Sequence, residues 1–70
     1  MKLHYYPGTD SLYIDLSSRR GMDSVEVADG VVVDFDEDGN VVGIDIDQAS
    51  RLLDLRTVET EGLPLRAPAS

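Results

Sequence analysis

Apolar and polar residues alternate along the first two-thirds of this 70-residue chain, and a period of two is the signature of half-buried β-strands. Clusters of Gly, Pro, Asp and Asn interrupt the alternation and mark turns. A chain of this length forms one domain, near the lower limit for folding without disulfides or metals, and it contains no cysteine. The strands must therefore share one small core. The predicted strands lie at about residues 2–6, 11–16, 24–28, 31–36 and 41–46.

The apolar positions also predict how the strands pair, because residues directly opposite each other share a face of the sheet. Keeping the apolar residues of neighbouring strands on one face favours a three-residue loop, Ala28–Gly30, with Gly30 in a left-handed bulge. It also favours four-residue loops at 7–10 and 37–40. The predicted pairs are Leu3 with Ile14, Tyr5 with Leu12, Val25 with Val33, Val27 with Val31, Val33 with Ile44 and Phe35 with Val42.

After Ile46 the period changes to that of a helix, with Asp47 as the expected N-cap and a short apolar stripe at Ala49, Leu52 and Leu53. We therefore predict an α+β fold: a five-stranded antiparallel β-meander with one C-terminal helix packed on its apolar face. A helix of two to three turns is too short to cover five strands. Residues 1–55 are the predicted domain, and residues 56–70, which contain Gly and Pro, are a partly disordered tail.

Acidic side chains outnumber basic ones by 14 to 6, which gives a formal net charge of −8. Such a charge repels the phosphate backbone of DNA and RNA, so nucleic acid is not an expected partner. It favours a small basic protein as a partner. No run of apolar residues reaches the ~20 that span a bilayer, so no membrane association is expected. The absence of cysteine fits a reducing cytoplasm, where we expect the protein to reside.

Asp34, Asp36 and Asp38 alternate along the chain and precede Gly39, which is the D-x-D-x-D-G spacing that opens a calcium-binding loop. Counting from Asp34, the twelfth position is Asp45, where such loops normally carry a bidentate glutamate. Helices flank calcium loops of this kind, whereas alternating strands flank this one. The same residues also form an ordinary hairpin turn, which we favour. A divalent-cation site made of Asp34, Asp36, Asp38 and Asp45 is the alternative.

Residues suited to catalysis are few. His4 is the only imidazole, and it shares a predicted strand face with Tyr13 and Asp15. That set could orient a general base, but the sequence lacks a Gly-rich phosphate loop and any thiol. A shallow sheet face also leaves little room for a pocket that excludes water. We therefore expect no enzymatic activity, no catalytic residue and no cofactor.

The predicted outer face of the sheet carries apolar and aromatic residues among its acids, namely Tyr6, Tyr13, Val32 and Val41. The last strand, an edge in a meander, carries no Lys or Pro that would hinder pairing with another chain. A domain with so small a core gains stability by burying such surfaces in an oligomer. We expect these residues to form an interaction surface and the protein to form a dimer.

Four segments of the chain form a distinctive combination: HYYP at 4–7, DSLYI at 10–14, VVVDFD at 31–36 and GNVVGIDI at 39–46. With them the chain resembles a small bacterial family catalogued as domain of unknown function two-two-eight-three, over roughly residues 2–53. The resemblance implies a small stand-alone prokaryotic domain without an assigned activity, cofactor or catalytic residue. Together with the residues, it predicts a non-enzymatic interaction or regulatory module that self-associates. A calcium-binding domain is the alternative.

Overall fold

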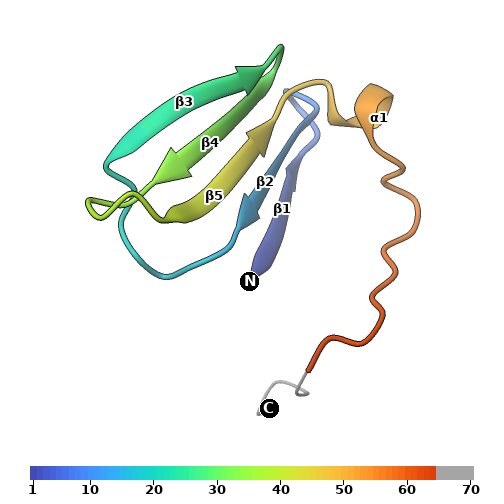
Figure 1. Cartoon of the computed structure of the whole chain (residues 1–70). Coiled ribbons are helices and arrows are strands. Elements are labelled where there is room, and N and C mark those ends of the chain that lie inside the picture. Colours follow the sequence, from blue (N-terminus) through green and yellow to red (C-terminus); the bar gives the residue numbers. More distant parts are fainter. Residues whose placement is uncertain (65–70) are drawn as a thin grey trace.

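A computed structural model describes residues 1–64, in which a five-stranded antiparallel sheet is followed by one short helix (Figure 1). The predicted α+β class is confirmed. The predicted disorder of the tail concerns in part residues 65–70, which lie outside the described residues. The elements are β1 Lys2–Tyr6, β2 Ser11–Asp15, β3 Asp23–Ala28, β4 Val31–Phe35, β5 Val41–Ile46 and α1 Ala49–Leu52.

The strand order is β1-β2-β5-β4-β3, so the predicted meander is wrong. The connection after β2 passes the ends of β5 and β4 before it enters β3 (Figure 1). It is tied to both strands, because the Leu16 N–H donates to the Val42 carbonyl (2.9 Å) and the Met22 N–H donates to the Phe35 carbonyl (2.7 Å). This order places β5, which contains four aliphatic side chains, at the centre. The edges are therefore β1 and β3, and β5 is not an edge.

Two apolar rows cross all five strands on one face, which we call the open face. At every step the register places an apolar residue opposite an apolar residue. The predicted pairs between β1 and β2, and the predicted pairs of Val33 with Val25 and with Ile44, are confirmed. The first row is Leu3, Ile14, Ile44, Val33 and Val25. The second row is Tyr5, Leu12, Ile46, Val31 and Ala28.

Two predicted pairs are wrong, and in both cases a bulge is the reason. Ala28, not Val27, lies opposite Val31, because β3 bulges between Glu26 and Ala28. The hairpin loop is consequently two residues long, although Gly30 has the predicted left-handed conformation (φ 78°).

The second bulge lies where β4 and β5 pair. Phe35 lies opposite Val41 instead of Val42, because the register shifts after Asp34, which pairs with Gly43. Each bulge absorbs one residue while the apolar rows stay in register, since a slip would move a whole strand's apolar set to the other face.

The helix α1 is shorter than predicted, and Asp47 is not its N-cap. Gln48 occupies that position in a left-handed conformation (φ 51°) without a side-chain cap. Asp10, in the turn between β1 and β2, supplies the bonds instead. Its carbonyl accepts from the Ala49 N–H (2.9 Å), and its carboxylate accepts from the Ser50 N–H (3.1 Å) and the Ser50 hydroxyl (2.6 Å). In the described part of the chain, no helix has the length and apolar character to cross a membrane.

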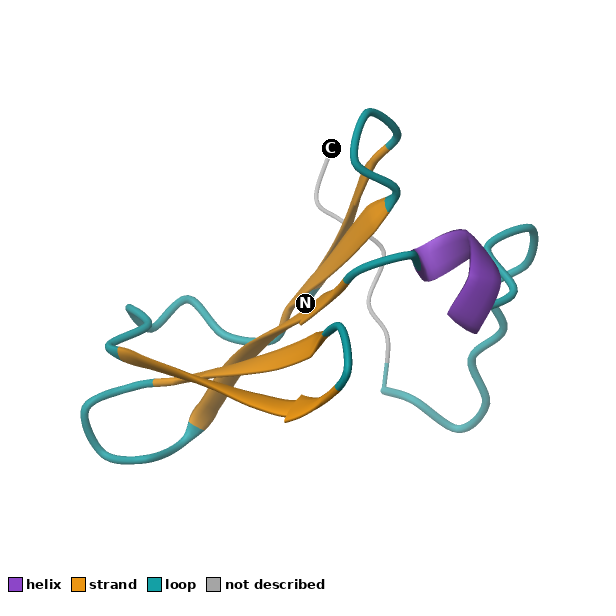
Figure 2. Cartoon of the chain, turned by 90° about the horizontal axis from the view of Figure 1, so that it is seen from above, coloured by secondary structure: helices purple, strands orange, loops and turns teal. Residues whose placement is uncertain are grey.

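The core of the described chain is small. Leu12, Ile46 and Ala49 form the buried cluster, and Val42 is buried near the other end of β5. The helix therefore covers only the end of the open face that is nearest to the turn at Asp10, and it lies to one side of the sheet (Figure 2). Within residues 1–64, no element covers most of the first apolar row.

Gly30→Ala tests the hairpin between β3 and β4. A Cβ at Gly30 has ordinary space, with Asp47 Cβ 3.5 Å away, but its φ of 78° is strained for an L-residue. We expect a loss of more than about 1 kcal/mol in the free energy of unfolding, measured by urea titration at fixed protein concentration. Gly8→Ala is the matched control, because its Cβ meets no atom within 4 Å. Equal stabilities of the two variants would contradict the left-handed turn.

Candidate functional site

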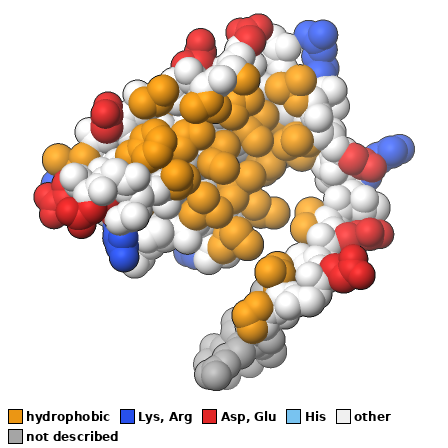
Figure 3. All heavy atoms as spheres, viewed as in Figure 1, with side chains coloured by type: hydrophobic (Ala, Val, Ile, Leu, Met, Phe, Trp, Pro, Cys, Tyr) orange, Lys and Arg blue, Asp and Glu red, His pale blue; other side chains and the backbone are white. Residues whose placement is uncertain are grey.

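The open face is the surface of this molecule that most needs an explanation. Its two edges are the most exposed parts: Leu3 and Tyr5 on β1 retain 49% and 44% exposure, and Val25 on β3 retains 46%. Figure 3 shows hydrophobic side chains gathered in one continuous area over the sheet. A contiguous exposed apolar area of this kind is uncommon on a monomeric protein.

A groove runs along the β1 side of the open face. It has a volume of about 620 Å³ and lies between the sheet and the segment that follows α1. The sheet contributes Leu3, Tyr5 and Leu12 to one wall. The other wall is formed by Leu53, Leu55 and Val58, together with Asp54 and Arg56, which form an ion pair (3.3 Å). The groove is therefore apolar on both walls.

Hydrogen bonds hold the sheet wall of this groove in place. The Tyr5 hydroxyl donates to an Asp10 carboxylate oxygen (2.8 Å), and the other oxygen accepts from the Ser50 hydroxyl (2.6 Å). The bond to Asp10 raises the pKa of Tyr5, and the bonds from Ser50 and Tyr5 lower the pKa of Asp10. One carboxylate thus connects β1 to α1.

Most charges of the sheet lie on its other face, which we call the acidic face. Two neighbouring rows there read Lys2, Asp15, Gly43, Asp34, Ser24 and His4, Tyr13, Asp45, Val32, Glu26. None of the ten positions in the two apolar rows of the open face is charged, and Asp23, opposite Phe35 at the start of β3, is the acid of the strands that shares their face. The two rows are therefore a neutral apolar surface on a strongly acidic chain.

Tyr13 organises the acidic face. Its hydroxyl donates to Asp34 (3.1 Å), whose second oxygen accepts from the Ser24 hydroxyl (2.7 Å). The ring lies over Gly43 so closely that a Cβ there would overlap the Tyr13 hydroxyl. Burial, followed by the bond to Asp34, raises the pKa of Tyr13. Gly43 is thus needed for a close approach, and this polar contact joins β2 to β4 across β5.

The acidic stretch forms a hairpin turn, and Asp36 is its centre. The Asp36 carboxylate is buried and accepts from the backbone N–H groups of Asn40 (2.9 Å) and Asp38 (2.9 Å) and from Arg19 (3.1 Å). The Asn40 N–H is the largest cause of its lowered pKa, and Arg19 contributes as well. The carboxylate oxygens of Asp36 therefore already accept hydrogen bonds from the backbone of the turn and from Arg19.

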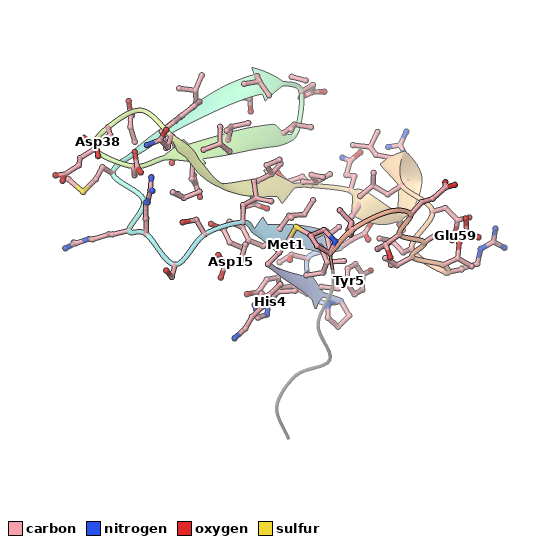
Figure 4. All side chains as sticks on the ribbon, turned by 60° about the horizontal axis from the view of Figure 1, so that its bottom comes forward. Met1, His4, Tyr5, Asp15, Asp38 and Glu59 are labelled. Atoms are coloured by element: carbon pink, nitrogen blue, oxygen red, sulfur yellow. The ribbon has the colours of Figure 1, made fainter. Side chains whose placement is uncertain are left out.

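The four carboxylates of the predicted divalent-cation site are not brought together. Asp34 and Asp45 lie on the acidic face beside Tyr13, whereas Asp36 is buried in the turn and Asp38 is at its tip (Figure 4). Within residues 1–64, no group of three or more His, Cys, Asp or Glu side chains is arranged to hold a metal ion. The cation-binding alternative stays a prediction.

The predicted interaction surface is spread over four strands. Tyr6 on β1 is exposed and stacks on His4, with ring centroids 6.5 Å apart. Tyr13 and Val32 are half-buried on the acidic face, and Val41 is exposed where it pairs with Phe35. This surface also stays a prediction.

The larger exposed apolar area is the opposite, open face. Sequence reasoning missed it because it treated Leu3, Tyr5 and Val25 as core residues. The feature of the sequence that indicated an exposed apolar face was the predicted helix, which is too short to cover five strands.

The hydrogen bonds of Asp36 predict how the stability of the protein depends on pH. The pKa of Asp36 is below the ordinary 3.8, so the contribution of Asp36 to stability is complete above that value and is lost as the pH falls through the lower, folded-state pKa. We expect the free energy of unfolding to fall between about pH 5 and pH 2 and Asp36→Asn to remove part of that slope. Asp38→Asn, which removes an exposed carboxylate from the same turn, is the control. Identical slopes for both variants and the parent chain would rule out this role for Asp36.

The comparisons with known proteins give one match, to a protein family. A family model described as "Protein of unknown function (DUF2283)" matches residues 2–50, which include all five strands. No curated protein and no solved structure matches the chain. The family match covers more than half of the sequence and confirms the resemblance seen in its motifs. The chain therefore belongs to the DUF2283 family of proteins of unknown function.

Proposed function

We propose that this protein is a non-enzymatic interaction module of the cytoplasm that works as a homodimer and buries its open face against a second copy. The observation that supports the proposal is the row from Leu3 to Val25, which crosses five strands and which no element of the described part of the chain covers along most of its length. A regulatory role belongs to the same proposal, because a module that pairs reversibly can be controlled by its concentration.

The size of the core is the first argument. Among the described residues, the buried apolar side chains are Leu12, Val42, Ile46 and Ala49, and no large side chain is fully enclosed. Burying a whole Leu or Val side chain stabilises a protein by about 1.5–3 kcal/mol, so covering half of one contributes about 1 kcal/mol. Several half-exposed residues on each of two copies therefore offer a stabilisation comparable to that of a small domain.

The distribution of charge is the second argument. Two copies with a net charge of −8 repel each other, but the acids of the sheet rows lie on the face that would point away from the partner. Packed sheets are about 10 Å apart, and the two acidic faces would be further apart than the Debye length of about 8 Å at physiological salt. Salt thus screens the repulsion, and we expect dimerisation to strengthen as salt is raised.

Val25→Lys tests the proposal directly. Val25 and Glu26 are adjacent on the exposed edge strand β3, but Val25 faces the open side and Glu26 the acidic side. We expect the parent chain and Glu26→Lys to sediment as dimers and Val25→Lys to sediment as a folded monomer at the same concentration. Both variants lower the net negative charge, so a general charge effect cannot produce this difference.

Two outcomes contradict the proposal. One is a folded parent chain that stays monomeric up to about 1 mM, where a stabilisation beyond about 4 kcal/mol would already be visible. The other is equal dimerisation of Val25→Lys and the parent chain, which places the interface elsewhere. A monomeric chain that binds a small basic protein would replace the second copy with that partner.

A further inference from the structure

The open face has different shapes at its two edges. At the β1 edge lies the groove between Leu3, Tyr5 and the segment after α1. At the β3 edge, Val25 and Val27 are 46% and 58% exposed, and the strand has no covering element among the described residues. One edge is therefore hollowed and apolar, and the other presents Val25 and Val27 on a strand that has no outer neighbour among the described residues.

A symmetric dimer can bring these two edges together. In an interface with two-fold symmetry, a patch on one copy that contacts a second patch on its partner is contacted by that partner in the same way. The central strand is β5, with β1 and β3 each two strands away from it. A two-fold axis that lies between the open faces and runs along β5 places β1 of each copy over β3 of the other. It also keeps the first apolar row of one copy over the first row of its partner.

We propose that the dimer has this axis, so that β3 of each copy occupies the groove beside β1 of the other. The inference rests on the proposed self-association and specifies how the two copies are arranged. Val25 and Val27 then lie against the walls that contain Leu3, Tyr5 and Leu12. Contacts between apolar side chains from both copies exclude water from both edges of the sheet at once.

The position of the segment after α1 fits this arrangement. This segment runs beside β1, on the side of the sheet away from β3, whereas α1 follows the end of β5 after two residues (Figure 1). After rotation about an axis along β5, the partner's segment lies beside the first copy's β3. The segment from Leu53 to Val58 then flanks the partner's β3. This covers an edge strand that carries no Lys or Pro to hinder unwanted pairing.

The other face-to-face arrangement leaves the two edges unmatched. An axis across the strands places β1 over the partner's β1 and β3 over the partner's β3. The two grooves then face each other, and the two β3 strands also meet. Two facing grooves leave a void at one side of the interface, and the side chains around a void lose van der Waals contacts that would stabilise the dimer. Complementary shape therefore favours the axis along β5.

Cysteine cross-linking distinguishes the two arrangements, because the chain contains no native cysteine. Leu3 and Val25 are in one row but four strand spacings apart, about 19 Å within a single chain. The double variant Leu3→Cys/Val25→Cys is treated with a bis-maleimide reagent that reaches about 10 Å, the spacing of packed sheets. We expect a covalent dimer from the double variant and almost none from either single variant. Lys2→Cys/Ser24→Cys, one residue away on each strand and on the acidic face, is the control that should not cross-link.

The result separates the failure of the arrangement from the failure of self-association. Cross-linking of Leu3→Cys alone, in a chain that sediments as a dimer, overturns the axis along β5 and leaves the homodimer intact. A dimer in which only the control pair cross-links also overturns it, because the acidic faces would then meet. A chain that sediments as a monomer and gives no cross-link in any variant refutes the proposed function itself.

Discussion

Two apolar rows that cross all five strands are the constraint on which this structure depends. Each strand contributes one residue to each row, so the register of every pair is fixed by its neighbours. The bulges near Val27 and Val42 follow from the same constraint, because each places an extra residue outside the strand pairing and so keeps the apolar residues of both rows on one face. The central position of β5 follows as well, since its aliphatic residues gain most from neighbours on both sides.

Asp10 determines which part of these rows is covered. Its carboxylate accepts from Tyr5 and Ser50, and its carbonyl accepts from the N–H of Ala49, so α1 is held at the turn between β1 and β2. Ala49 is consequently buried against Leu12 and Ile46. A four-residue helix fixed there covers only the middle of the second row, at Leu12 and Ile46, and cannot reach the first row toward β3. The same contacts that complete the small core therefore leave the open face exposed.

The alternation of residues predicted the strands, their shared apolar face and the left-handed Gly30, because these depend on neighbours in the chain or on parity. The alternation could not predict the strand order, since β2 has the same apolar face whether it pairs with β3 or with β5. The capping of α1 by Asp10 was equally hidden, because it joins residues 40 positions apart. The candidate site was predicted only in part. The helix was recognised as too short, but exposure was assigned to Tyr6, Tyr13, Val32 and Val41, because alternation identifies which face is apolar and does not reveal what covers it.

The central claim is that a second copy buries the open face, and an isotope-filtered nuclear Overhauser experiment on a mixture of labelled and unlabelled chains tests it most directly. Only contacts between copies give cross-peaks in that experiment. We expect them from the methyl groups of Leu3, Ile44 and Val25, which lie in the first row. Cross-peaks confined to Val32 on the acidic face, in a chain that is dimeric, would contradict the account and place the interface on the other side of the sheet.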